Sequence, residues 1–101
     1  MKKELKYQMI RTYSAGVFAG YVKKLWVENG LRLAVVEKAR RIWYWSGAAS
    51  LSQLAMEGTK DPQNCKFPCE VDRVELSNVV EILDITPAAK KSIKGVPVWQ
   101  K

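Results

Sequence analysis

The chain has 101 residues, of which 48% are hydrophobic, so it can bury one compact core and we expect a single domain. No apolar run reaches the roughly 20 residues that a membrane span requires, and the charged stretch from Met1 to Tyr7 lacks the apolar segment of a secretory signal. We therefore expect a cytoplasmic protein with no membrane partner.

The formal net charge of +7 lies entirely in the first half of the chain. Residues 1–50 hold ten Lys and Arg against three Asp and Glu, whereas residues 51–101 hold seven against seven. A basic surface attracts phosphate groups, so nucleotides and nucleic acids are candidate ligands. The alternative is a solvated basic surface that only keeps the protein soluble.

The first 45 residues are predicted to form three strands, over residues 6–13, 17–27 and 31–45. Between the second and the third lies Asn29-Gly30, a pair that readily adopts positive φ and is the strongest short signal for a tight hairpin. Gly20 indicates a bend or bulge within the second strand.

The third predicted strand contains an interruption, because the run Glu37-Lys38-Ala39 breaks its alternation of apolar and polar residues. If the chain bulges there, Ile42 and Tyr44 return to the core face of the sheet. The residues on the opposite face are then Arg41, Trp43 and Trp45.

The second half is predicted to contain two short helices and two further strands. Ser50 and Gln53 fit a capping box that begins a two-turn helix, which Gly58 ends. A loop over residues 59–69 leads to strands over 71–76 and 79–85, separated by a turn at residues 77–78. Thr86-Pro87 starts a second helix, because threonine caps well and proline is tolerated in the first turn. This helix is predicted to end near Gly95. We expect residues 96–101 to form an extended tail and residues 1–6 to be flexible.

Five short strands and two short helices predict a mainly β (α+β) protein. The expected architecture is a small, strongly bent five-stranded barrel like the SH3 or Sm barrels, with one inserted and one C-terminal helix. The alternative is an open α+β sheet with both helices packed on one face.

Catalysis and metal binding find little support in the residue types. There is no histidine, which excludes the usual nucleophile–histidine pairs, and no phosphate loop or dinucleotide fingerprint is present. Cys65 and Cys69 lie in one loop, and a metal site would need two further ligands. We therefore expect no enzyme, no metal and no cofactor, with both thiols most simply reduced.

Binding is predicted for one segment, residues 40–47 (RRIWYWSG). Arginine can grip a phosphate with two hydrogen bonds and an aromatic face can stack on a base. The helix beginning near Ser50 offers free backbone amides just downstream. The alternative is that these aromatic residues fill the core or a subunit interface. The candidate ligand-binding residues are Arg11, Tyr13, Arg40, Arg41, Trp43, Trp45, Ser46, Gly47 and Ser50.

Residues 10–17, 39–48, 51–55 and 79–83 resemble a family of small phage and prophage proteins, and residues 41–47 (RIWYWSG) are the most specific part of the resemblance. The resemblance implies a phage setting in the host cytoplasm. In size, charge and this implied setting, the chain is similar to anti-defence proteins that sequester the nucleotide signals of bacterial immunity.

Three functions remain open at this point. The first is a non-catalytic homo-oligomer that binds an anionic nucleotide ligand in pockets shared between subunits. The second is a nucleic-acid-binding barrel that spreads phosphate contacts over Lys23, Lys24, Arg32 and Lys38. The third is a protein inhibitor of a host factor, with Trp99 and the aromatic strand as anchors.

Overall fold

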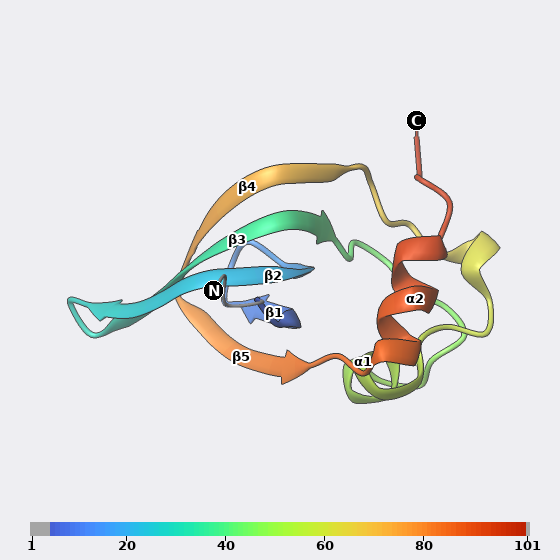
Figure 1. Cartoon of the computed structure of the whole chain (residues 1–101), viewed down its shortest axis with the longest axis horizontal. Helices are drawn as coiled ribbons and strands as arrows, with labels where there is room; N and C mark the ends of the chain where they lie inside the picture. The colour runs from blue at the N-terminus through green and yellow to red at the C-terminus, as the bar shows by residue number, and fades with distance from the viewer. Residues whose placement is uncertain (1–4, 101) are drawn as a thin grey trace.

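The computed structural model describes residues 5–100 and contains one antiparallel five-stranded sheet and two α-helices (Figure 1). This confirms a mainly β fold with an inserted and a C-terminal helix. The elements in chain order are β1 (Tyr7–Thr12), β2 (Val17–Glu28), β3 (Leu31–Arg41), α1 (Leu51–Glu57), a 3₁₀ turn (Pro62–Asn64), β4 (Glu70–Ser77), β5 (Val79–Asp84) and α2 (Pro87–Gly95). Neither described helix is long and apolar enough to cross a membrane.

The sheet has the order β4-β3-β2-β1-β5, so two strands that follow each other in sequence lie at its opposite edges. Asn78, at φ 55°, is the single residue between them. Figure 1 shows β4 and β5 leaving a shared corner and spreading apart toward α2. The expected barrel is therefore wrong: the edges meet only at this corner and do not pair, so the sheet stays open.

The β2–β3 hairpin turns where the sequence predicted it. Asn29 and Gly30 have φ values of 52° and 77°, and Glu28 faces Leu31 across the turn. Further along, Ala19 faces Arg40 but Tyr21 faces Glu37, so the pairing register shifts at Gly20 and Lys38. A β-carbon on Gly20 would lie 2.6 Å from Val36 Cγ1, so this bulge needs glycine.

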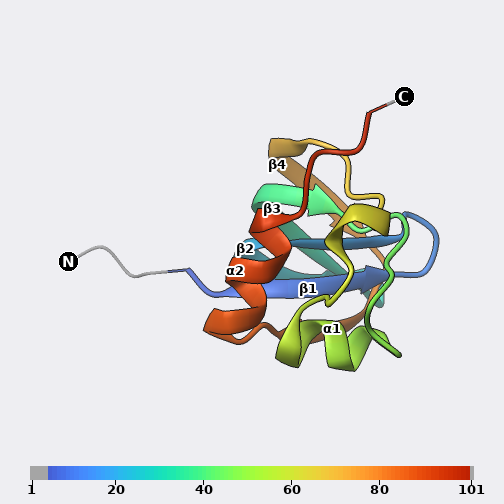
Figure 2. The same cartoon turned by 90° about the vertical axis from the view of Figure 1, so that its right-hand side faces the viewer.

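Apolar residues are buried on both faces of the sheet. On one face α1 and α2 cover a cluster that includes Met9, Ile42, Leu54, Phe67 and Ile93, and Figure 2 shows both helices in front of the strands. The other face has its own cluster, which includes Ile10, Phe18, Val36, Leu76 and Val79. Curvature of the sheet lets this second cluster be buried without a covering helix.

Both helices begin at the predicted caps. Ser50 Oγ accepts a hydrogen bond from the Gln53 amide (3.1 Å), and the Gln53 side chain accepts from the Ala49 amide (2.7 Å) rather than from residue 50. Thr86 Oγ1 accepts from the Ala89 amide (3.1 Å) and donates to the Met56 carbonyl (2.7 Å), which ties the two helices together. Each cap satisfies amides that the helix leaves free.

The third strand ends four residues earlier than expected, at Arg41. Beyond it the chain leaves β4 and forms an isolated bridge between Tyr44 and Lys66. Strand alternation therefore does not continue, and Tyr44 is exposed rather than in the core. Ile42 is buried as predicted.

Candidate functional site

Arg40, a predicted phosphate ligand, is instead a buried structural residue with 5% of its surface exposed. Its guanidinium donates to the carbonyl oxygens of Pro68, Ile93, Phe67 and Val96 at 2.7–3.1 Å. These acceptors take four of the five N–H donors of the guanidinium, and burial lowers the pKa of Arg40. Arg40 is therefore not available to a ligand, because its donors hold the segment before β4 to the end of α2.

Arg41, the next residue, points to the surface. Its guanidinium lies 4.4 Å from the centre of the Phe18 ring, and Nη1 donates to the Ala15 carbonyl at 2.5 Å. No carboxylate of residues 5–100 lies within 4 Å of it. Arginine has five N–H donors, so most of them remain free for a ligand.

Arg41 lines a pocket of about 330 Å³ on the face of the sheet that the helices leave uncovered. Arg73, on β4, contributes a second guanidinium, and Phe18 and Val74 give the pocket an apolar floor. Arg73 makes only a long ion pair with Glu75, at 3.7 Å, in which both side chains are exposed. The pocket thus combines two accessible arginines with apolar surface, which suits an anionic group attached to an organic molecule.

Trp43, two residues after Arg41, belongs to a surface of stacked aromatic rings. The Trp43 side chain is 59% exposed, and its ring stacks on that of Trp99 with centroids 5.0 Å apart and planes 22° apart. The Lys66 ammonium lies 5.3 Å from the Trp43 ring centre, 5.8 Å from that of Tyr44 and 5.6 Å from that of Trp99. We call these four residues the aromatic platform.

Backbone bridges hold the platform in place. Residues 43 and 44 bond the Lys66 backbone, and the Trp99 amide donates to the Phe67 carbonyl at 3.0 Å. Three segments far apart in the sequence therefore meet here. Exposed Arg41 and Trp43 flank buried Ile42 in the sequence. Arg41 lies at the pocket and Trp43 at the platform.

The remaining residues of the predicted segment serve the fold. Trp45 is half-buried and packs on the helix-covered core, which separates it from Arg41 and Trp43. Ser46 Oγ donates to Asp61 Oδ2 at 2.9 Å. Gly47, at φ 82°, lies where a β-carbon would be 2.5 Å from the Asp61 amide. Ser50 caps α1, a helix of seven residues.

Two further predicted residues come from β1 and the loop that follows it. The Arg11 guanidinium is paired with Glu81 at 3.0 Å, so a ligand would have to displace a carboxylate there. Tyr13 is 79% exposed, and its side chain has no hydrogen bond to residues 5–100. Its amide donates to the Asn78 carbonyl at 3.0 Å.

The structure thus keeps Arg41 and Trp43 as site candidates and adds Tyr44, which the sequence had predicted to face the core. It also adds three residues from distant segments, Lys66, Arg73 and Trp99, of which only Trp99 had been named, as an anchor for a protein partner. No local pattern in the sequence could have joined them, because they come from a loop, an edge strand and the tail. Cys65 is a buried free thiol and Cys69 an exposed one beside the pocket. Residues 5–100 contain no group of three or more metal-ligating side chains.

No curated protein and no solved structure matches the chain. Residues 5–93 match the model of a family described as "Domain of unknown function (DUF6948)". That match covers most of the chain, from before β1 to the last turn of α2. The chain therefore belongs to this family.

Proposed function

We propose that this protein binds an anionic nucleotide-type ligand without catalysis, with a base on the aromatic platform and a phosphate in the Arg41–Arg73 pocket. The observation that carries the proposal is the exposed Trp43–Trp99 stack, with the Lys66 ammonium beside it. Exposing two indoles is unfavourable unless a partner covers them, and a nucleobase does so by stacking.

The charges beside the platform fit the phosphate part of such a ligand. Arg41 and Lys66 have no carboxylate partner among residues 5–100, and Arg73 has only an exposed one. Arg41 and Trp43 are two residues apart in the sequence and both are exposed. One nucleotide unit could thus contact Trp43 and Arg41 together.

The phage resemblance supports a particular role for this binding. A small basic phage protein that captures a nucleotide and does not turn it over would lower the free concentration of a host signal. Sequestration of a cyclic or ADP-ribose-derived immune nucleotide is the form of the proposal that we favour. Capture requires only affinity and abundance, which is consistent with the absence of histidine from the sequence.

A second candidate, a single-stranded nucleic acid, is favoured by the position of Arg73. This side chain lines the pocket with Arg41 and also a separate pocket of about 280 Å³ with Lys23 and Lys24. The basic groups therefore continue from the platform along the sheet. A strand of several phosphates would follow such a track, whereas one nucleotide would occupy only its first part.

Titration of intrinsic tryptophan fluorescence tests the proposal, with cyclic dinucleotides, ADP-ribose derivatives and a ten-residue oligo-dT as ligands. Stacking on Trp43 should quench the emission in a saturable way. Trp43→Ala should weaken binding by about 1–3 kcal/mol and Arg41→Ala by about 1.5–3 kcal/mol, or at least about tenfold. Both side chains are exposed, so both variants should remain folded.

The matched control is Trp26→Ala, which removes a tryptophan from the β2–β3 hairpin, where its ring contacts Lys24 (4.8 Å). This variant should bind like the wild type. A weak dependence of the affinity on salt indicates a single nucleotide, and a steep one indicates a strand. The proposal is wrong if no ligand quenches the fluorescence, or if Trp43→Ala and Trp26→Ala weaken binding equally.

A further inference from the structure

A second cluster of polar groups lies away from the platform, between β2 and α2. The Tyr7 and Tyr21 rings meet edge to face, with centroids 5.1 Å apart. Two ammonium groups of α2 approach the same rings: Lys90 Nζ is 4.9 Å and Lys94 Nζ is 5.0 Å from the centre of the Tyr21 ring. Lys94 Nζ also donates a hydrogen bond to the Tyr21 hydroxyl oxygen at 3.0 Å.

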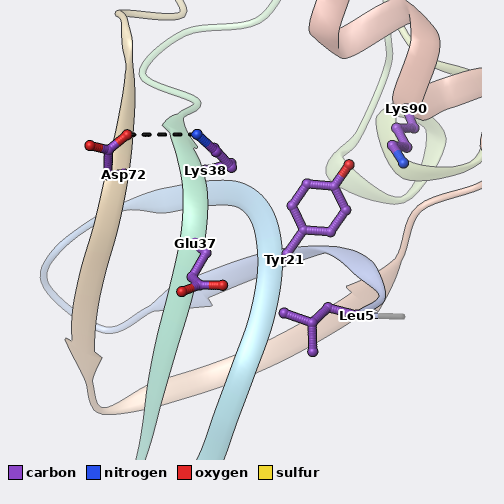
Figure 3. Close-up of a pocket in the computed structure, with 6 residues that line it drawn as sticks. All are labelled: Leu5, Tyr21, Glu37, Lys38, Asp72 and Lys90. Carbon is purple, nitrogen blue, oxygen red and sulfur yellow. Dashed lines mark ion pairs between the residues drawn. The ribbon is translucent and has the colours of Figure 1, made fainter. Parts of the chain in front are cut away.

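The cluster opens into a cavity of about 520 Å³, which shares no lining residue with the pocket at Arg41. Figure 3 shows Tyr21 reaching from β2 toward Lys90, with Glu37, Lys38 and Asp72 on the opposite wall. A volume of this size accommodates a small organic molecule rather than a bare ion.

The two walls of the cavity differ in how their charges are paired. On the strand side each acid already has a lysine: Glu37 pairs with Lys23 at 3.4 Å, and Asp72 with Lys38 at 3.8 Å. On the helix side, Lys90 lines the cavity, and Lys94 lies one turn further along α2 against Tyr21. Neither lysine has a carboxylate within 4 Å among residues 5–100. Two positive charges therefore converge on one phenol without a counter-ion.

The hydroxyl groups of Tyr21 and Tyr7 add hydrogen-bonding capacity beside the two lysines. The Tyr21 oxygen accepts from Lys94, which leaves its own proton free to be donated to an acceptor. The Tyr7 hydroxyl, in a side chain that is nine-tenths buried, has no hydrogen-bond partner among residues 5–100. Hydrogen bonds from Lys90 and Lys94 lower the pKa of Tyr21, whereas burial and then the charge of Glu70 raise the pKa of Tyr7.

We propose that Tyr21, Lys90 and Lys94 form a second ligand site, which binds the phosphate group of a small phosphate monoester. Such a group carries a charge of about −1.5 to −2 at neutral pH, which matches the two unpaired ammonium groups better than a single carboxylate does. The phenol donates to a third oxygen. The site is independent of the proposed nucleotide platform and does not require it.

Inorganic phosphate is the probe, and calorimetry against chloride at equal ionic strength measures its binding. The wild type should bind phosphate saturably. The double variant Lys90→Gln/Lys94→Gln should bind at least about tenfold more weakly, because each lost contact is a charged hydrogen bond. The control is Lys91→Gln, which removes the same charge from an exposed position on the same helix and should bind within about twofold of the wild type.

A second measurement follows Tyr21 itself through the absorbance of tyrosinate near 295 nm. Bound phosphate neutralises the two lysines, so it should raise the pH at which Tyr21 ionises, and Tyr21→Phe should remove that step. Tyr21 does not line the pocket at Arg41, so phosphate bound in that pocket should leave the ionisation of Tyr21 unchanged, and this readout reports the second site alone. Equal phosphate binding by the double variant and Lys91→Gln, or no saturable binding by the wild type, would overturn the proposal.

Discussion

Replacing Arg40 tests whether this side chain holds the fold together. Its guanidinium donates to the carbonyl oxygens of Pro68 (3.1 Å), Ile93 (2.9 Å), Phe67 (3.1 Å) and Val96 (2.7 Å). Two of these acceptors lie at the C-terminal end of α2, where the helix dipole favours positive charge. One hydrogen bond to a charged group contributes about 1.5–3 kcal/mol, but bonds from one side chain are not additive. We therefore expect Arg40→Ala to lower the free energy of unfolding by about 3–5 kcal/mol.

Urea unfolding followed by circular dichroism measures this loss, with Arg41→Ala as the control for charge. Arg41 is exposed and makes one carbonyl contact, so its removal should cost about 1 kcal/mol or less. Arg40→Lys keeps the charge but not the planar fork that reaches several carbonyls, so its stability should fall between those of the wild type and Arg40→Ala. An Arg40→Ala protein within about 1 kcal/mol of the wild type would refute the structural role.

Three further outcomes are expected. Gly58→Ala should lower the stability by about 2–4 kcal/mol, because the new β-carbon would lie 2.4 Å from Ser92 Cβ at a residue whose φ is 79°. Gly30 has a similar φ of 77° but nothing within 4 Å, so Gly30→Ala should cost only about 1 kcal/mol, and Gly30→Val more. Equal losses for Gly58→Ala and Gly30→Ala in thermal melts would contradict this expectation. Above about pH 10 Tyr7 ionises in the unfolded chain but stays protonated in the folded protein, so the free energy of unfolding should fall as the pH rises. In urea titrations at alkaline pH, Tyr7→Phe should show a smaller fall in stability than the wild type. Exposed Val27 (67%) and Met56 (61%) are expected to be covered in a homo-oligomer. Sedimentation at roughly tens of micromolar would show the oligomer, and a clean monomer would rule it out.

The elements that the sequence predicted well depend on short-range effects. Asn29-Gly30 sets the hairpin because two adjacent residues adopt positive φ. Ser50 and Thr86 start their helices through hydrogen bonds to amides three residues away. Such signals lie within a few residues of sequence, so they can be read without knowing what packs nearby.

The errors concern contacts between distant segments. Alternation predicted a strand to Trp45, but the chain leaves β4 after Arg40 and meets Lys66 instead. Likewise, two adjacent arginines look equivalent in the sequence. Only the fold shows that Arg40 is buried against backbone carbonyls 27–56 residues away, whereas Arg41 stays exposed. The spacing of Lys90 and Lys94 predicts one helix face, but only the fold brings Tyr21 of β2 to that face.

The corner at Asn78 also bears on the order of folding. Arg11 of β1 and Glu81 of β5 pair although they are 70 residues apart, a separation that makes direct loop closure slow. Once β4 has paired with β3, however, Ser77 faces Leu33 and the next residues are already beside Thr12, which pairs with Val79. The strands that have already paired then bring β1 close to the end of β4, so β5 has only a short loop left to close before it pairs with β1. In this way a connection of one residue converts the pairing of β1 with β5, which are far apart in the sequence, into a local step.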